Sequence, residues 1–310
     1  MYGLDSLPTA ARGGVLTIGN FDGVHVGHMS IITRARQLAD ADGLTVMAMT
    51  FEPPPDLVIR PDDPPQRLTP PEQKARLLRQ AGADWIVFVP TTRELLALQA
   101  EDFVRQIVLQ FVAPRHVVEG HDFSFGRERA GNVDTLREIG LGEGFEVDVV
   151  EPVTVDLPGG RRQVCSTLVR RLVAEGQMEE ASQCLGREFA LYGEVVSGRG
   201  RGRSLGFPTA NIEVHQQVIP ARGIYAGLAD VNKRTYASAI SIGRPPTFPD
   251  ANQTIEAHLI DVKEEWYGQP MVLRFVCQLR RQRQFGSAEA LSAQIAKDVE
   301  RVREICRKHV

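Results

Sequence analysis

The chain has 310 residues and a formal net charge of −3, with 43% hydrophobic and 24% charged residues. This length suits two domains, and the composition excludes a fibrous or largely disordered protein. Four cysteines are scattered without a Cys-x-x-Cys pair, which favours reduced thiols over a disulfide framework. No apolar run approaches a membrane span and residues 1–14 contain no signal-peptide core, so we expect a cytoplasmic protein.

Charge is divided unevenly along the chain. Residues 1–189 contain 19 Lys and Arg against 27 Asp and Glu, whereas residues 190–310 contain 17 against 12. The arginines of the second part cluster in a Gly-rich loop and at residues 280–283, without an aromatic platform between them. This pattern fits the phosphates of a mononucleotide better than a nucleic-acid polymer. A solvated basic face is the simpler alternative for residues 280–283.

The first half alternates short apolar runs, typical of buried strands, with helical patterns. The expected strands are Val15–Ile18, Leu44–Phe51, Trp85–Val89, His116–Glu119 and Phe145–Val150. The expected helices lie near residues 29–42, 71–81, 100–112 and 134–141. The alternation predicts a Rossmann-like α/β domain whose parallel sheet binds ligands at the carboxyl ends of its strands. The Pro-rich stretch 53–70 is expected to be a loop near that edge.

The first strand leads into a glycine-rich corner that contains His25 and His28. The corner joins a strand to a helix, where backbone N–H groups and the positive end of the helix dipole attract phosphate. Its glycines allow the backbone to approach a ligand closely. We therefore expect a nucleoside triphosphate site with both imidazoles as donors to phosphoryl oxygens. Metal ligands or a hydrogen-bonded core histidine are the alternatives, but no Cys or third His nearby completes a zinc site.

The pattern changes near Phe189, where short strand-like segments recur with Gly, Pro or Asn between several of them. These segments are Leu191–Ser197, Ile224–Val231, Thr235–Ile242, Thr254–Ile260 and Met271–Leu279. Their spacing predicts a small antiparallel β-barrel. Ser287 is suited to cap a final helix that runs to about Arg307 with one apolar stripe. We place an N-terminal domain at residues 1–187 and a C-terminal domain at residues 188–310.

A run of alternating Gly and Arg over residues 198–203 precedes the segment Pro208-Thr209-Ala210-Asn211. The run combines backbone donors with cationic side chains and is suited to wrapping a polyphosphate, with a disordered basic linker as the alternative. The Thr209 hydroxyl and the Asn211 amide, two residues apart, would share one face of a strand. Both oxygens are suitable ligands for Mg²⁺.

Glu256 lies within an apolar strand pattern, with His258 on the same face. A carboxylate in such a place could accept the proton of an alcohol during phosphorylation. The more ordinary role for a glutamate in a strand is that of an exposed cross-strand partner. The residues alone leave both roles open.

Several motifs together resemble one family. Gly19–His28 resembles the His-x-Gly-His signature of the nucleotidyltransferase superfamily and, more narrowly, the N-terminal half of bacterial bifunctional riboflavin kinase/FAD synthetases. Later segments are similar to that family in the same order. They are Thr50-Phe51-Glu52-Pro53, Gly120–Gly126 with its Asp-Phe-x-Phe-Gly turn, Cys165–Arg170 with its Ser-Thr-x-x-Arg pattern, and Pro208–Asn211.

The resemblance implies two reactions that use ATP. The second domain would phosphorylate riboflavin to FMN with Glu256 as catalytic base, and the first would adenylylate FMN to FAD and release pyrophosphate. His25 and His28 are the implied catalytic donors of the first domain, because the FMN phosphate is already ionised and needs only positioning and charge stabilisation. Mg²⁺ is the implied cofactor, with ATP as co-substrate and FMN and FAD as product ligands. The partners are these small molecules, without nucleic acid or membrane.

The same motifs give the remaining expected site residues. Nucleotide and phosphate contacts are Gly19, Asn20, Phe21, Asp22, Gly27, Asp122, Ser166, Thr167 and Arg170 in the first domain, and Gly198, Gly200, Arg201, Gly202 and Arg203 in the second. Ser166 and Thr167 would serve equally well as helix caps. The expected metal ligands are Thr209 and Asn211. Trp266, Tyr267 and Phe285 are expected to stack on the flavin ring, with core packing as the alternative.

Three positions depart from the family pattern. Pro54 stands where the family has an imidazole, Cys165 replaces the first Ser of Ser-Ser-Thr, and Gln282 replaces the Glu of an Arg-x-Glu segment. The first two bear on adenylyl transfer and the third on the kinase site. A kinase with a degenerate first domain is therefore a rival hypothesis. A flavin- or nucleotide-binding regulator without turnover is another, although it leaves the pairing of a Mg²⁺ motif with Glu256 unexplained.

Overall fold

The computed structural model describes residues 3–198, 206–243, 254–262 and 264–308. The chain divides into two compact units. The first comprises Met1–Gln66 and Pro71–Cys165, and the second comprises Arg67–Pro70 and Ser166–Val310. Residues 166–187, which the sequence assigned to the N-terminal domain, thus group with the second unit. The functional boundary at residue 187 stays a prediction.

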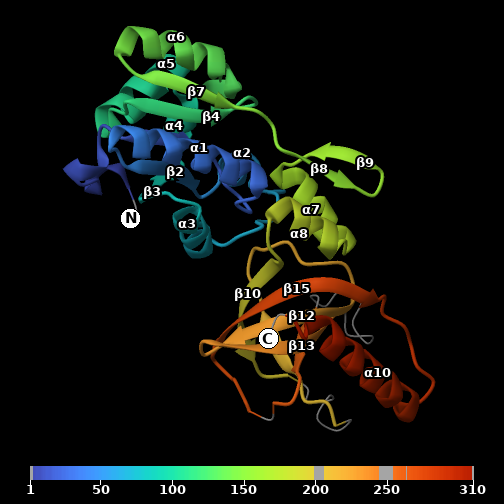
Figure 1. Cartoon of the computed structure of the whole chain (residues 1–310). Helices are drawn as coiled ribbons and strands as arrows, with labels where there is room; N and C mark the ends of the chain where they lie inside the picture. Colours follow the sequence, from blue (N-terminus) through green and yellow to red (C-terminus); the bar gives the residue numbers. More distant parts are fainter. Residues whose placement is uncertain (1–2, 199–205, 244–253, 263, 309–310) are drawn as a thin grey trace. The chain divides into compact units, whose positions relative to one another are not determined.

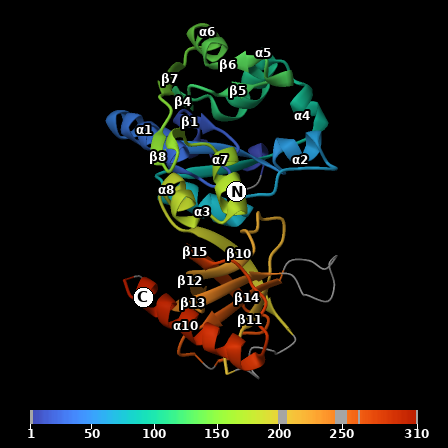
Figure 2. The ribbon, with the colours of Figure 1, turned by 90° about the vertical axis from the view of Figure 1, so that its right-hand side faces the viewer.

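The first unit is built on a five-stranded sheet in the order β3-β2-β1-β4-β7, with every neighbouring pair parallel. Its strands are β1 (Val15–Ile18), β2 (Val46–Glu52), β3 (Trp85–Pro90), β4 (His116–Gly120) and β7 (Glu146–Val150). Parallel strands need crossover connections, and the helices of these crossovers cover both faces of the sheet (Figure 1 and Figure 2). The predicted Rossmann-like architecture is confirmed.

Two groups of helices bury the two faces of this sheet. On one face lie α1 (Val26–Asp42) and α3 (Pro71–Gln80), and on the other lie α5 (Ala100–Phe103), the π-helical segment η3 (Val104–Val112) and α6 (Val133–Glu143). Successive strand residues alternate between the two cores, so Val15 and Val118 join the α1 side whereas Leu16 and Val117 join the α6 side. Because both cores are apolar, β1, β2 and β3 are nearly continuous hydrophobic runs, which made them predictable.

The other elements of the first unit are short. They are η1 (Leu4–Ser6), η2 (Thr9–Ala11), α2 (Pro55–Ile59), α4 (Arg93–Ala97), β5 (Ser124–Phe125), η4 (Arg127–Arg129), β6 (Gly131–Asn132), β8 (Thr154–Leu157) and β9 (Gly160–Gln163). The sequence did not predict the antiparallel hairpin of β8 and β9, because its largely exposed residues form no apolar run. The prediction of a loop over 53–70 was wrong in part, since α2 occupies residues 55–59.

The two central strands diverge toward their carboxyl ends. β1 pairs with β2 as far as Ile18 and Met49, but its pairing with β4 stops at Leu16 and Val117. The sheet order places β2 and β3 on one side of β1 and β4 and β7 on the other. The topological switch point therefore lies between β1 and β4, where open α/β sheets bind ligands.

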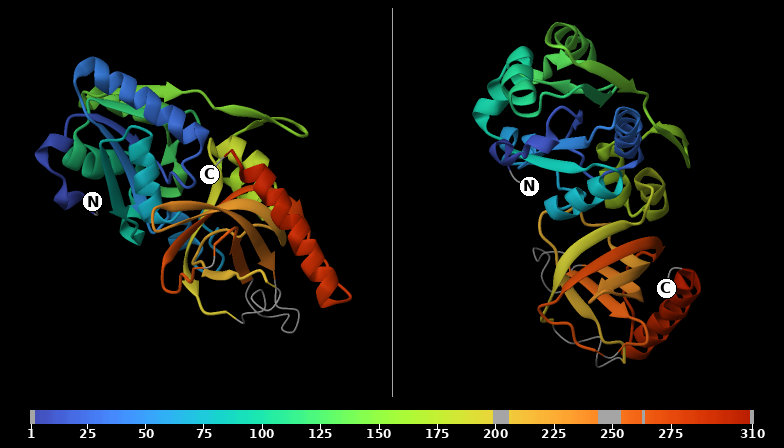
Figure 3. Two further views of the ribbon diagram at one scale, coloured as in Figure 1. Left: turned by 60° about the horizontal axis from the view of Figure 1, so that its bottom comes forward. Right: turned by 60° about the vertical axis from the view of Figure 1, so that its left-hand side comes forward.

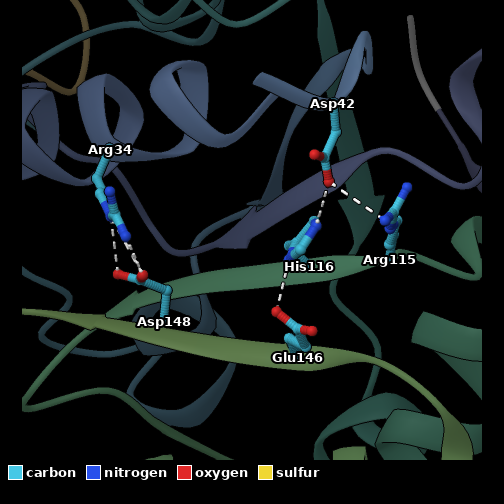
Figure 4. Close-up of polar contacts among 6 residues, drawn as sticks. All are labelled: Arg34, Asp42, Arg115, His116, Glu146 and Asp148. Carbon is cyan, nitrogen blue, oxygen red and sulfur yellow. Dashed lines mark hydrogen bonds and ion pairs between the residues drawn. The ribbon is translucent and has the colours of Figure 1, made fainter. Parts of the chain in front are cut away.

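Ion pairs fix α1 to the sheet. The Arg34 guanidinium of α1 binds the Asp148 carboxylate of β7 at 2.6 Å, as Figure 4 shows. Near the amino end of β4, the buried His116 ring lies between two carboxylates, with Nε2 3.0 Å from Asp42 and Nδ1 3.4 Å from Glu146 (Figure 4). These contacts join α1, β4 and β7 away from the strand ends that form the predicted ligand edge.

The second unit contains a closed six-stranded barrel in the order β10-β11-β14-β13-β12-β15. Its strands are β10 (Phe189–Val196), β11 (Ala210–Glu213), β12 (Gly223–Val231), β13 (Arg234–Gly243), β14 (Thr254–Leu259) and β15 (Pro270–Arg280), all antiparallel to their neighbours. Phe189, Phe275 and Tyr225 pack together as buried aromatic rings. The predicted barrel is confirmed, and β11 completes it.

Within the described residues of the second unit, three helices accompany the barrel. They are α7 (Ser166–Glu175), α8 (Met178–Leu185) and α10 (Ala288–Cys306). Figure 3 shows α10 along the outside of the barrel, where Val299 and Val302 pack on Ala226 and Leu228 of β12. The predicted cap is confirmed, because the Ser287 side chain accepts a hydrogen bond from the Ala290 N–H. The Arg280 guanidinium binds Asp298 at 2.7 Å and so ties the end of β15 to α10.

The segment Arg67–Pro70 pairs with the loop that follows β11. The Arg67 N–H donates to the Gln216 carbonyl at 3.1 Å, and the Val218 N–H donates to the Arg67 carbonyl at 2.9 Å. The Gln217 amide, only 2% exposed, donates to the Leu68 carbonyl and accepts from the Tyr192 N–H. Because these are hydrogen bonds of buried groups, the segment is an integral part of the second unit.

Candidate functional sites

The predicted phosphate corner connects β1, which ends at Ile18, with α1, which begins at Val26. The helix was expected to begin near Met29 and begins earlier because His25 caps it: His25 Nδ1 accepts a hydrogen bond from the His28 N–H at 3.3 Å. His28 therefore lies in the first turn of the helix. Both histidines are thereby placed at the positive end of a helix of 17 residues.

The two imidazoles form one stacked group. Their ring centroids are 3.6 Å apart with an interplanar angle of 17°, and the Phe21 ring meets His28 edge-on at 5.2 Å. A Cβ at Gly27 would lie 3.2 Å from the His25 ring, so a glycine is favoured here by packing. Gly19 likewise packs on the Phe21 ring, where a Cβ would approach to 3.2 Å. The structure thus brings together the residues at the two ends of the predicted motif.

Hydrogen bonds to β2 also fix the residues that directly follow β1. The Gly19 N–H donates to the Met49 carbonyl at 3.0 Å, and the Thr50 hydroxyl donates to the Asn20 carbonyl at 3.2 Å. Lys74 of α3 reaches the same hydroxyl with its ammonium group at 3.5 Å and is only 2% exposed. Sequence reasoning missed Lys74 because one lysine in a helical pattern gives no signal of burial. Its presence adds a cation to the support of this corner.

Asp22 and Asp122 take different positions in the first unit. Asp22 is buried within the corner, whereas Asp122 is exposed in the turn after β4, in which the Phe123 N–H donates to the Gly120 carbonyl. Asp122 therefore stands at the carboxyl end of β4, as the sequence predicted from topology. Its contact with phosphate stays a prediction.

Glu119 of β4 is a second residue that the sequence did not mark. Its carboxyl Oε1 accepts a hydrogen bond from the Ile18 N–H at 2.6 Å, and the residue is only 2% exposed. Burial raises the pKa of Glu119 well above its ordinary value, and the hydrogen bond from Ile18 opposes that shift only in part. The available signal was a carboxylate inside an otherwise apolar parallel strand.

In the second unit, strand register brings the kinase-motif residues together. Asn211 of β11 lies directly opposite Glu256 of β14, which in turn lies opposite Ser241 of β13. Their neighbours Ile212, Ile255 and Ile242 are buried, so alternation places the three polar side chains on the other face of the strands. We call Asn211, Glu256 and Ser241 the polar row. Glu256 is half-buried within it.

Two contacts fix the segment before β11. His258 Nδ1 donates to the Pro208 carbonyl at 2.7 Å, and its ring meets Phe207 edge-on at 5.6 Å. A Cβ at Gly198 would overlap Asn211 Nδ2, so the Asn211 amide fills the space over that glycine. Gly198 and His258 therefore place Asn211 and the preceding Thr209. Thr209 itself precedes β11, which begins at Ala210.

Comparisons with known proteins match two different families to the two parts of the chain. The family model described as FAD synthetase matches residues 7–167, and the one described as riboflavin kinase matches residues 185–306. The bifunctional riboflavin kinase/FMN adenylyltransferase of Escherichia coli K12 is 35% identical over 97% of this chain and 96% of the relative. That of Listeria monocytogenes is 36% identical over 92% and 90%. The chain belongs to this bifunctional family.

A solved structure has a similar fold over nearly the whole length of this chain. A protein of Streptococcus pneumoniae, solved under the name macrolide-efflux protein, has a TM-score of 0.88 and 25% identity, over 98% of each chain. As a bifunctional riboflavin kinase/FMN adenylyltransferase family member, this chain is an enzyme with a FAD synthetase domain and a riboflavin kinase domain. Among the described residues, no helix is long and apolar enough to cross a membrane.

The structure locates the three residues that depart from the family motifs. Pro54 precedes α2 directly and offers no donor at that position, and Cys165 is a half-buried free thiol. Gln282 approaches the polar row, with Nε2 3.5 Å from the Ser241 hydroxyl, and it occupies the space over Gly243. This position of the Arg-x-Glu segment therefore contacts Ser241, the cross-strand partner of Glu256, and here its side chain is neutral.

The remaining predicted residues of this family member are placed as follows. Ser166, Thr167 and Arg170 lie in α7, so their role toward the first unit stays a prediction. Trp266 is buried 6.0 Å from the Tyr236 ring, Tyr267 is exposed, and Phe285 packs under the guanidinium groups of Arg280 and Arg283. Gly200, Arg201, Gly202 and Arg203 lie outside the described residues. In the part that the structure describes, no three His, Cys, Asp or Glu residues form a metal cluster.

Proposed function

We propose that the polar row of the barrel transfers the γ-phosphoryl group of ATP to the ribityl hydroxyl of riboflavin, and that the phosphate corner transfers the adenylyl group of a second ATP to FMN. The membership in the bifunctional family supports the pair of reactions. The single observation that supports the division of labour is the register that sets Asn211 opposite Glu256, within the part of the chain that matches riboflavin kinase.

In the kinase reaction, the attacking group is an alcohol, which is a poor nucleophile while protonated. Glu256 would accept the hydroxyl proton as the oxygen attacks the γ-phosphorus and ADP leaves. Asn211, across the register, would hold a phosphate oxygen or the cation that accompanies ATP. His258 contributes indirectly, because its bond to the Pro208 carbonyl places the strand that contains Asn211.

In the adenylyl transfer, the attacking group is the FMN phosphate, which is already ionised at neutral pH. The reaction therefore needs no base, and the protein would act by positioning and by stabilising charge on the α-phosphoryl oxygens and on pyrophosphate. The imidazoles of His25 and His28 and the N–H groups of the first turn of α1 are donors suited to that task.

A divalent cation fits the kinase site by the chemistry of its donors. The Thr209 hydroxyl and the Asn211 amide oxygen are oxygen ligands of the kind that Mg²⁺ prefers, and Gly198 leaves the space that the Asn211 amide occupies. Mg²⁺, when bound, supplies charge neutralisation on the phosphates. We also propose a cytoplasmic location, which the four free cysteines support.

The deciding experiment follows both products. The full-length protein is incubated with riboflavin, ATP and MgCl₂, and the flavins are separated by chromatography over time. We expect FMN first and then FAD, and a parallel reaction with FMN should give FAD and pyrophosphate. FMN without FAD would reject the adenylyl transfer and support a kinase with a degenerate first domain. Bound flavin without any product would reject both activities in favour of a regulator.

A further inference from the structure

The divergence of β1 and β4 leaves the backbone at the end of β1 without its ordinary partner. β1 and β4 stay paired through Leu16 and Val117 only, whereas β4 continues to pair with β7 as far as Gly120 and Val150. The Ile18 N–H would otherwise face a gap between two central strands. A buried N–H group without an acceptor destabilises the folded state.

The Glu119 side chain fills this role. Its Oε1 atom accepts the Ile18 N–H at 2.6 Å, and the carboxyl group lies among the apolar residues on the face that Leu16 and Val117 share. The carboxyl thus spans the two strands where their main chains no longer pair. It is a side-chain replacement for a ladder hydrogen bond at the switch point of the sheet.

The contact between Ile18 and Glu119 matters because Ile18 is the last residue of β1, directly before the corner. Gly19 follows directly, bonded to β2 through the Met49 carbonyl, and the corner that ends at His25 begins there. Glu119 therefore holds the corner from the β4 side while Met49 and Thr50 hold it from the β2 side. A loss of the β4 contact would free the backbone that places the two imidazoles.

We propose that Glu119 is a positioning residue for adenylyl transfer, which sets the separation of β1 and β4 and thereby the geometry of the His25 and His28 corner. The proposal rests on the proposed function of the first unit. Burial raises the pKa of the Glu119 carboxyl, so the neutral acid is the form that the apolar surroundings favour. Glutamine keeps both the length and the acceptor oxygen of that form, whereas leucine keeps only the approximate volume.

The test compares Glu119→Gln, Glu119→Leu and Glu119→Asp in the full-length protein, with FMN, ATP and MgCl₂ as substrates. Riboflavin phosphorylation by the barrel serves as the internal measure of active protein in each sample, and circular dichroism checks that the first unit is folded. We expect kcat for FAD formation to fall at least tenfold in the leucine and aspartate variants. The glutamine variant should keep kcat within about threefold of the wild type.

Each outcome decides the proposal. A folded leucine or aspartate variant with wild-type kcat would overturn it, because the contact with Ile18 would then be dispensable. A glutamine variant as slow as the leucine variant would overturn it as well, since a proton donor rather than an acceptor would be needed. If leucine does not fold, the aspartate variant decides, because its shorter side chain cannot reach Ile18. Absence of FAD with the wild-type protein would instead reject the proposed function.

Discussion

The two candidate sites are built from different kinds of structural element. In the first unit, the groups proposed to bind phosphate are a helix N-terminus and two stacked rings within four residues of one another in sequence. In the second, Asn211, Glu256 and Ser241 come from three strands and meet only through the register of the barrel. The first site is thus local in sequence, and the second depends on the closure of a whole barrel.

The difference follows from the nucleophile. An ionised phosphate needs donors that stabilise charge, and a strand-helix corner supplies them from the backbone and nearby rings. An alcohol needs a carboxylate beside the phosphoryl-binding residues, and those chemically unlike groups are brought together by neighbouring strands. The comparison predicts that the two activities can be lost separately.

The largest separation is expected for Glu256→Ala. Removal of a general base typically costs about 10²- to 10⁴-fold, so riboflavin phosphorylation should fall by that factor while FAD formation from supplied FMN is unchanged. Steady-state rates of FMN and FAD formation measure both. Glu213→Ala, at an exposed position of β11, is the matched control and should keep both rates. Loss of both activities in folded Glu256→Ala protein would contradict the two-site model.

His28→Ala tests the proposed role of the phosphate corner in the first unit. It removes a charge-stabilising donor from the first turn of α1, for which a loss of about 10²- to 10³-fold in FAD formation is typical. Riboflavin phosphorylation should stay at the wild-type rate. Thr33→Ala, an exposed position on the same helix, controls for effects on α1 itself. If the kinase rate fell in parallel with FAD formation, the corner would not be a separate site.

Gly198→Ala sharpens the account of the kinase site. The added methyl group would collide with the Asn211 amide, which must then leave its position over residue 198. We expect roughly a tenfold drop in kinase kcat/KM for MgATP, which corresponds to about 1.4 kcal/mol. Gly142→Ala adds its methyl group in open space on α6 and should change nothing. Equal kinetics in the two variants would show that Asn211 tolerates displacement.

The last prediction concerns the stability of the first unit as a function of pH. The pKa of Glu119 in the folded protein is raised above the ordinary value near 4.5. At a pH between these two pKa values, the folded protein holds a proton on Glu119 that the unfolded chain releases. The free energy of unfolding should therefore fall as pH rises from about 4.5 toward the raised folded pKa, by at most about 1.4 kcal/mol per pH unit. Thermal unfolding of the wild type and Glu119→Gln from pH 5 to pH 8 measures this. A wild-type curve parallel to that of the glutamine variant would contradict it.

Much of the fold was accessible from the sequence because its signals are local. The strands of the first sheet lie in short, largely apolar runs, Ser287 has the side chain of an N-cap, and the corner has glycines beside its histidines. The start of α1 was placed too late because a histidine cap is an unusual signal. The polar row was approached only through the motif spacing and the resemblance.

The site contacts that sequence reasoning missed depend on residues far apart in the sequence. Ile18 and Glu119 meet across two neighbouring strands whose divergence no local pattern encodes. The burial of Lys74 depends on where α3 packs against the sheet. The packing of Asn211 over Gly198 requires the return of β11 beside β10. Such contacts leave no periodicity in the sequence.

The segment Arg67–Pro70 makes the two halves interdependent as pieces of chain. Four residues from the middle of the adenylyltransferase sequence complete the hydrogen bonding of Gln217 and its neighbours in the kinase unit. A gene fragment that begins at codon 188 would produce a barrel with that buried amide opened to water, and it would also lack α7 and α8. We therefore expect a fragment that begins at residue 188 to be less stable than the same unit in the full chain.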